Sequence, residues 1–247
     1  MARSAQGIEM LKNIALLIDA DNVTPDGIDP VLTVLAELGQ VNIRRAYGNW
    51  AKPALVHWSK HTLRYGLQPI QQFDLTRGKN ATDMAMTIDA IDLLYRGKVD
   101  GFGIMSSDSD FTPLATRLRQ DGITVYGFGD SKTPDAFRTA CTRFIEVDAL
   151  IAAAQGDDKP AGGTVSPPAP KHPVDEEIIE LLGGAWKASK RDADGFARLA
   201  EVGNIANNRS SFDVRNFGFR RLVDLIESTG QFKVDRREDG VYVKRLR

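Results

Sequence analysis

The sequence predicts an α/β fold, with a parallel sheet between two layers of helices, followed by a smaller α+β domain. Over roughly the first 150 residues, short apolar runs rich in β-formers alternate with helix-length amphipathic segments, and this rhythm is typical of parallel sheets. Residues 155–172 contain four Pro and three Gly and too few apolar groups to fold. We therefore expect domains at residues 1–154 and 173–247, joined by a flexible linker at residues 155–172.

Five strands and four helices are expected in the first domain. The strands are predicted, in chain order, at residues 14–18, 41–47, 67–73, 101–105 and 123–128. The helices between them have apolar residues at three- and four-residue spacing and are predicted at residues 29–38, 53–65, 81–95 and 111–120. If the strand order reverses after the third strand, the first and fourth strands are neighbours, and ligands bind at their carboxyl ends.

Aspartates stand where these two strands end. Asp19 ends the apolar run in IALLIDADN, and Asp108 and Asp110 follow GFGIM in SSDSDF. A carboxylate at the lip of a buried sheet is costly to ionise unless a cation compensates it. Because no Cys or His stands nearby, one or two Mg²⁺ or Mn²⁺ ions are expected rather than Zn²⁺. This metal chemistry is typical of phosphodiester or phosphoryl transfer.

Four other side chains are candidates for the same site. Asp83 begins the helix after the third strand, where it either serves the helix dipole or joins the site. Asp21 lies two residues beyond Asp19, so one carboxylate of this pair is expected to support the other. Ser106 and Ser107 are expected to orient a carboxylate or contact phosphate, with a simple capping role as the alternative.

The order of LLIDADN, RGKNATDMAM and IMSSDSDFTPLATRLRQDGITVYGFG resembles the NYN domain, a branch of the PIN-like nuclease superfamily, over roughly residues 14–151. The resemblance implies a PIN-like α/β/α sandwich that uses divalent metal ions to cleave RNA. The expected reaction is endonucleolytic cleavage of single-stranded RNA. It assigns the acidic positions of the family to Asp19, Asp83 and Asp108, with Asp110 nearby, and the polar partner of the first acid to Asn22.

RNA contacts in this domain are expected from loops at the same edge of the sheet. The segment RRAYGNWAK combines cations with aromatic rings, a mixture suited to single-stranded RNA. The alternative is that the rings pack beneath a helix and the arginines are solvated. The candidate RNA-binding residues are Arg44, Arg45, Trp50, Lys52, Arg77, Lys79 and Lys132.

The C-terminal domain has the pattern of a winged helix. Helices are expected at residues 174–186, 196–206 and 214–226, before a hairpin that turns at Asp239 and Gly240. The stretch VGNIANNRSSFDVRNFGFRRLVDLIESTGQFKVDRREDGVYVKRL resembles the OST-HTH, or LOTUS, domain, and this resemblance implies binding of RNA or docking of a protein. The candidate contacts are Arg215, Arg220 and Arg221 on the third helix and Lys233, Arg236, Arg237, Lys244 and Arg245 on the wing.

Composition adds limits but does not name a partner. The net charge is −1, so RNA must be held by local basic patches. With one cysteine, no apolar signal core and no run of about 18 apolar residues, the chain is expected to be cytoplasmic and free of the membrane, and its oligomeric state is left open. Two other functions remain: a non-catalytic RNA-binding or docking adaptor, and a haloacid-dehalogenase-like phosphatase, suggested by DADNV alone.

Overall fold

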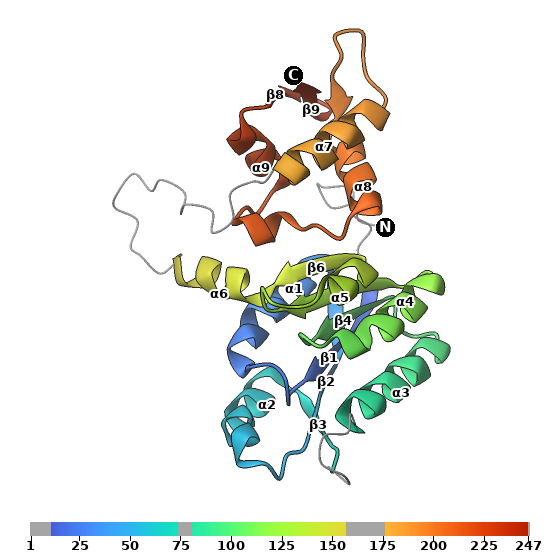
Figure 1. Ribbon diagram of the computed structural model, residues 1–247, viewed down its shortest axis with the longest axis vertical. Helices are drawn as coiled ribbons and strands as arrows, with labels where there is room; N and C mark the ends of the chain where they lie inside the picture. The colour runs from blue at the N-terminus through green and yellow to red at the C-terminus, as the bar shows by residue number, and fades with distance from the viewer. Residues whose placement is uncertain (1–10, 74–80, 157–175, 247) are drawn as a thin grey trace. The chain divides into compact units, whose positions relative to one another are not determined.

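A computed structural model describes residues 11–73, 81–156 and 176–246. The chain divides into two compact units, Met1–Ile151 and Ala152–Arg247, and each is described by itself (Figure 1). The predicted linker lies mostly outside the described residues. Its expected start at residue 155 falls within helix α6 (Val147–Gly156), so the regular structure continues slightly further than the sequence indicated.

The first unit contains a six-stranded sheet in the order β3-β2-β1-β4-β5-β6, and every neighbouring pair is parallel. This arrangement confirms the predicted fold class, and β1 and β4 are neighbours. Five strands fall on the expected runs, while β6 was not anticipated because a four-residue strand leaves little periodicity to detect. The strands are β1 (Leu11–Asp19), β2 (Gly39–Gly48), β3 (Gln68–Gln71), β4 (Gly101–Met105), β5 (Thr124–Gly129) and β6 (Arg143–Glu146).

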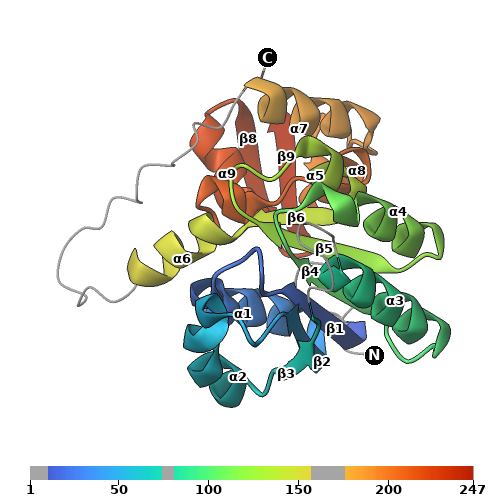
Figure 2. The same ribbon diagram turned by 60° about the horizontal axis from the view of Figure 1, so that its bottom comes forward.

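Helices cover both faces of this sheet (Figure 2). Along β1, Ile14, Leu16 and Ile18 face one core and Ala15 and Leu17 face the other, because successive side chains of a strand point to opposite sides. The first core is covered by α1 (Ile28–Leu38), α2 (Ser59–Tyr65) and α6. The second is covered by α3 (Ala81–Tyr95), α4 (Thr112–Gln120) and α5 (Asp135–Ala140).

Short 3₁₀ turns join several of these elements. They are η1 (Pro25–Gly27), η2 (Pro53–Trp58) and η3 (Ser109–Phe111). The helix expected over residues 53–65 is therefore η2 followed by α2. Helix α5 was also not anticipated from the sequence. Within the described residues, no helix is long and apolar enough to cross a membrane.

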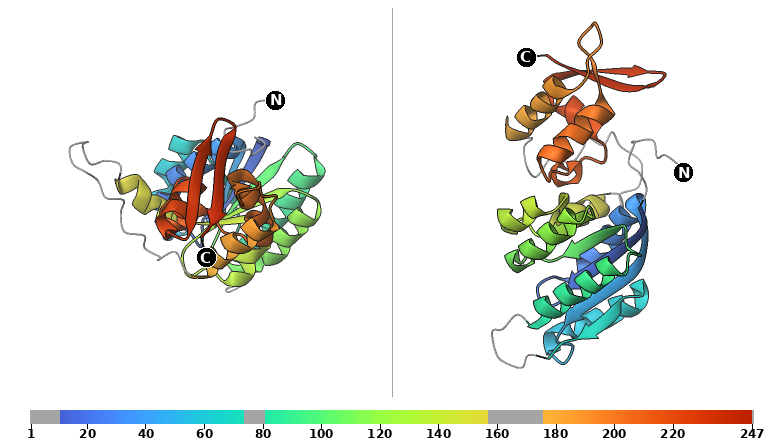
Figure 3. Two further views of the ribbon diagram at one scale, coloured as in Figure 1. Left: turned by 90° about the horizontal axis from the view of Figure 1, so that it is seen from above. Right: turned by 90° about the vertical axis from the view of Figure 1, so that its right-hand side faces the viewer.

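The second unit has helices packed on one side of a three-stranded antiparallel sheet in the order β7-β9-β8, and its hairpin is drawn in red in Figure 3. Two expected helices differ from the prediction. The second begins later because Ala197 and Arg198 pair with β9, and the third is broken at Gly218, whose φ is +80°. The elements are α7 (Glu176–Ala188), β7 (Ala197–Arg198), α8 (Leu199–Arg209), η4 (Val214–Phe217), α9 (Leu222–Thr229), β8 (Phe232–Arg237) and β9 (Gly240–Arg245).

Candidate metal centre

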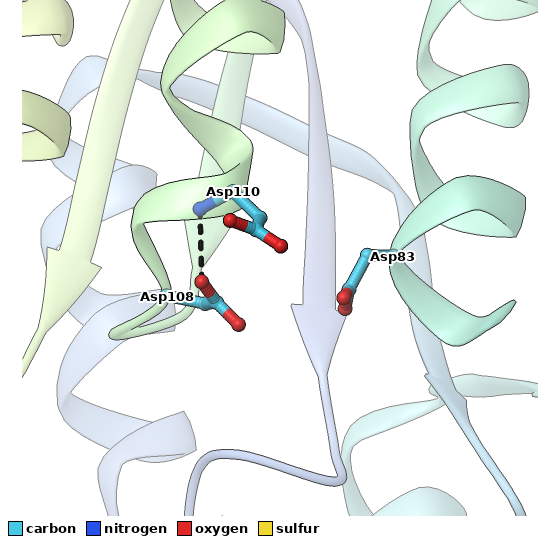
Figure 4. Close-up of side chains that lie close together, drawn as sticks. All are labelled: Asp83, Asp108 and Asp110. Carbon is cyan, nitrogen blue, oxygen red and sulfur yellow. Dashed lines mark hydrogen bonds between the residues drawn. The ribbon is translucent and has the colours of Figure 1, made fainter. Parts of the chain in front are cut away.

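Three aspartates from two separate segments meet at the carboxyl end of the sheet (Figure 4). Asp83 lies in the first turn of α3, Asp108 caps η3 and Asp110 lies within η3. One carboxylate oxygen from each lies within 4.8 Å of the others. The backbone N–H of Asp110 donates to Asp108 Oδ1 at 2.8 Å, which fixes the turn that presents both side chains.

Asp19 lies beside this cluster at the end of β1 and is fully buried. Its Oδ2 atom accepts hydrogen bonds from Asn22 Nδ2 and Ser106 Oγ, each at 2.8 Å. Ser106 Oγ also accepts the backbone N–H of Asp108 at 3.1 Å. One hydroxyl therefore ties the first acid to the turn that carries two others.

The strand register explains why Ser106 has this position. Ile18 on β1 pairs with Met105 on β4, so the next residues along, Asp19 and Ser106, come together. Both Ser106 and Ser107 were predicted from the sequence to orient a carboxylate. Ser107 Oγ accepts the backbone N–H of Asp130 at 3.0 Å, and so it supports the loop after β5. Knowing that β1 and β4 are neighbours was not sufficient to choose the correct serine, because the register was also needed.

The electrostatics of the cluster reflect crowded carboxylates. Burial raises the pKa of the Asp83 carboxyl from its ordinary value of 3.8 to about 6, and repulsion from Asp19, Asp108 and Asp110 adds to this shift. Burial also raises the pKa of Asp19, although its hydrogen bonds from Asn22 and Ser106 oppose the shift. A bound cation would relieve both the repulsion and the loss of hydration.

The donor set suits a hard divalent cation. All its ligand atoms are carboxylate oxygens, and oxygens on opposite sides of an Mg²⁺, Mn²⁺ or Ca²⁺ ion are about 4–5 Å apart. Asp19 Oδ1 is also buried without a hydrogen-bond partner among the described residues, so one lone pair in the site is left for a ligand. Asp83, Asp108 and Asp110 can hold an ion from three positions, with Asp19 adjoining them.

Asp21 has a different environment from these four acids. Its carboxylate accepts hydrogen bonds from Lys52 Nζ at 3.2 Å, Thr82 Oγ1 at 3.0 Å and the Asn49 backbone N–H at 3.3 Å. Asp21 is thus neutralised by Lys52 and holds the residue next to Asp83. The hydrogen bond from Thr82 to Asp21 was not predicted from the sequence. In the phosphatase alternative Asp21 would be the general acid, a role that this ion pair disfavours.

The segment expected to bind RNA through RRAYGNWAK is largely engaged within the protein. The Arg44 guanidinium donates to the carbonyls of Val41 at 3.0 Å and Tyr65 at 2.9 Å. The Arg45 guanidinium forms an ion pair with Asp89. These arginines therefore brace the sheet and its helices, and the expectation that they contact phosphate stays a prediction.

The remaining residues expected to bind RNA in this unit have mixed outcomes. Trp50 Nε1 donates to the Ile70 carbonyl at 3.0 Å, and its ring meets Trp58 edge-to-face with centroids 6.2 Å apart, which is the packing alternative. Lys132 is exposed in the loop after β5. Arg77 and Lys79 lie outside the described residues.

Cys141 lies in the core on the α3 side of the sheet. Burial raises the pKa of its thiol to about 12, so it carries almost no thiolate at neutral pH.

Most basic candidates in the second unit are also paired with acids. Arg215 lies on η4 and Arg220 and Arg221 precede α9, so none lies on the long third helix that was expected. The ion pairs are Arg215–Asp213, Arg221–Asp224, Arg236–Glu227, and Arg237 with both Asp192 and Asp235. Arg245 has a buried Nε atom. Lys233 and Lys244 form no ion pair with any described residue.

Comparison with known proteins agrees with these two units. The NYN domain matches residues 13–148 and the OST-HTH/LOTUS domain matches residues 171–244. An uncharacterized protein of Methanocaldococcus jannaschii, MJ0482, is 28% identical over 121 residues, which are 47% of each chain. The chain thus spans about half the length of this curated relative. A protein of unknown function from Vibrio parahaemolyticus, VPA0982, is similar in its crystal structure, with 22% identity, a TM-score of 0.47 and coverage of 57% of this chain and 96% of that one.

The two matched families together indicate a role as a nuclease or an RNA-binding protein. The order of the acidic motifs, the sheet that brings them together and the family match over more than half of the chain all agree. The chain belongs to the NYN-domain family of PIN-like nucleases, and an OST-HTH/LOTUS domain follows its NYN domain.

Proposed function

We propose that this protein is an endoribonuclease that uses Mg²⁺ or Mn²⁺ to cut single-stranded RNA. The observation that supports the proposal most strongly is the meeting of Asp83, Asp108 and Asp110 within 4.8 Å. Two of these acids lie on the turn after β4 and the third on α3, so the folded sheet is needed to form the site. A cluster with this donor set has a clear use in binding a divalent ion.

The side chains of the acidic site have separate roles in the proposed reaction. Asp83, Asp108 and Asp110 hold one or two ions, and Asp19 faces the same region from the sheet. Asn22 and Ser106 donate hydrogen bonds to Oδ2 of Asp19 and hold the carboxylate in place. Its other oxygen, Oδ1, is buried without a hydrogen-bond partner among the described residues and is left to bind a ligand. Divalent ions supply positive charge that favours ionisation of the attacking water and stabilises the leaving oxygen of the phosphodiester.

The second unit has the task of holding RNA. We place catalysis in the NYN domain and RNA retention in the OST-HTH/LOTUS domain, joined through residues 157–172. A tether raises the effective concentration of the substrate near the acids without new contacts to the scissile bond. Docking of a protein partner by this domain is the alternative use of the same surface.

The test is cleavage of a labelled single-stranded RNA by the full-length protein in Mn²⁺, Mg²⁺ or chelator. Replacement Asp108→Asn should lower the cleavage rate by about 10² or more, because one ligand charge is lost. Asp92→Asn, at an exposed position of α3, is the matched control and should cleave normally. Both variants should still bind RNA.

Two results would contradict the proposal. Cleavage that persists after complete chelation would exclude the metal mechanism. RNA binding without cleavage under every metal condition would instead identify a non-catalytic RNA-binding adaptor. Mass spectrometry of the products separates internal cutting from removal of single nucleotides at an end.

A further inference from the structure

The sheet of the second unit has one face packed on its core and one face directed away from it. Val234 and Val243 are paired across the two strands and belong to the core. Because side chains alternate along a strand, the neighbouring pair Lys233 and Lys244 lies on the opposite face. This outer face is defined here by six side chains: Phe196, Lys233, Asp235, Arg237, Tyr242 and Lys244.

Two lysines directly opposite each other are the unusual feature of the outer face. Lys233 pairs with Lys244 in the antiparallel register, and like charges in this arrangement destabilise a hairpin. Neither lysine forms an ion pair with any residue in the part of the chain that the structure describes. The repulsion is thus left for an external anion to relieve.

The rest of the outer face contains two aromatic rings and a planar cation that lies over both of them. The Arg237 guanidinium lies over the Tyr242 ring at 4.2 Å from its centroid and over the Phe196 ring at 5.3 Å. Lys244 Nζ lies 5.8 Å from the Phe196 centroid. Asp192 and Asp235 hold Arg237 in place, so a flat aromatic and guanidinium surface adjoins the two lysines.

Three other basic residues of this unit are less available. Arg221 is held by both oxygens of Asp224 at 2.9 and 2.7 Å, and Arg236 pairs with Glu227 at 2.7 Å. Arg245 packs on Gly183, where a side-chain carbon would lie 1.9 Å from the guanidinium. An anion that bound at these positions would first have to displace an acid or open the packing of α7.

We propose that the outer face binds a single strand of RNA, with phosphates at Lys233 and Lys244 and bases against Tyr242 and Phe196. The inference rests on the proposed RNA-binding role of this unit and assigns it to one surface. The two lysines carry the charge that a phosphate backbone needs. The aromatic rings beside them can stack with unpaired bases. The base-paired interior of a duplex offers no free bases for such rings.

Binding of a fluorescent single-stranded RNA to the full-length protein in chelator tests the inference, because no cleavage is then measured. The affinity of RNA falls as salt rises, with a slope of log K against log salt of about −0.7 for each phosphate contact of a single strand. The double variant Lys233→Gln with Lys244→Gln should make this slope shallower by about 1.4, because two contacts are lost. At 0.1 M salt this corresponds to affinity weaker by about 25-fold.

A second double variant also removes two positive charges, but from arginines that form ion pairs within the protein. Arg221→Gln with Arg236→Gln should leave the salt slope unchanged. Tyr242→Leu should weaken binding about tenfold with little change in slope, because a stacked base is lost and no charge, while Tyr242→Phe should retain the wild-type affinity. Melting curves of all variants exclude loss of folding as the cause.

The inference is overturned if the lysine variant keeps the wild-type slope and affinity, if the arginine variant loses them instead, or if the wild-type protein binds no RNA. If the wild-type protein binds no RNA but binds a protein partner through these lysines, the outer face is a docking surface for that partner. The proposed nuclease activity is tested separately in Mn²⁺. If RNA binding depends on the lysines but no cleavage is seen, the inference stands and the nuclease proposal fails. If RNA is cleaved but its binding does not depend on the lysines, the nuclease proposal stands and the inference fails.

Discussion

Replacing Asp83 with Asn should stabilise the metal-free protein while removing its response to metal. In the folded protein the carboxyl has a pKa of about 6, against an ordinary value of 3.8, so ionisation opposes folding. Each pKa unit corresponds to about 1.36 kcal/mol, which gives an upper limit of about 3 kcal/mol for the penalty in neutral solution. Because Asp83 is partly exposed, solvent screening reduces the expected gain to about 1–2 kcal/mol.

The sign follows from proton binding. The folded state holds the proton of Asp83 more tightly than the unfolded state, so stability falls as pH rises from about 3.8 to about 6. The penalty is complete above this range. The gain from Asp83→Asn should therefore be largest at pH 7.5 and roughly half as large at pH 5.

Differential scanning calorimetry in chelator measures this effect. The transition of the NYN domain should rise by about 3–6 °C at pH 7.5, since about 1 kcal/mol shifts the melting temperature by 2–4 °C for a protein of this size. Added Mn²⁺ should raise the wild-type transition but not that of the variant. The reasoning is refuted if Asp83→Asn melts at or below the wild-type temperature in chelator, or if Asp92→Asn gives the same rise.

Three further predictions concern the residues around the site. Ser106→Ala should slow cleavage about tenfold or more and lower stability by about 1–2 kcal/mol, measured by kinetics and urea unfolding, because the buried Asp19 carboxylate loses a donor. Asp89→Ala should lower stability by about 2–4 kcal/mol in the same unfolding assay, since it leaves Arg45 partly buried without its carboxylate. Cys141 should react with iodoacetamide only as the protein unfolds, because burial raises the pKa of its thiol to about 12; rapid labelling of the folded protein would contradict this.

The sequence predicted the general position of the site better than the roles of the individual side chains. Asp19 and Asp108 each follow an apolar run, and the alternation of strands and helices placed both runs in one parallel sheet. The approach of Asp83 was inferred from its place after the third strand and from the resemblance to the NYN domain. The predicted parallel sheet is confirmed, because periodicity and chain order carry information about sheets.

The partners of the charged side chains could not be predicted in the same way. Arg45 and Asp89 are 44 positions apart, and Lys52 and Asp21 are 31 apart, so no local pattern joins them. The break at Gly218 also removed Arg215, Arg220 and Arg221 from the expected helix, because that glycine adopts a left-handed conformation. Several basic residues that the sequence offers are therefore engaged in ion pairs within the protein.

The central position of β1 has a consequence for the order in which the protein is made. β1 is synthesised first, yet its contact through Asp19 and Ser106 spans 87 positions. A nascent chain can pair β1 with β2, and β2 with β3, while the other edge of β1 still lacks β4. Until Asp110 has left the ribosome, the chain carries no complete acidic cluster, so the cluster can form only after β4 has been made.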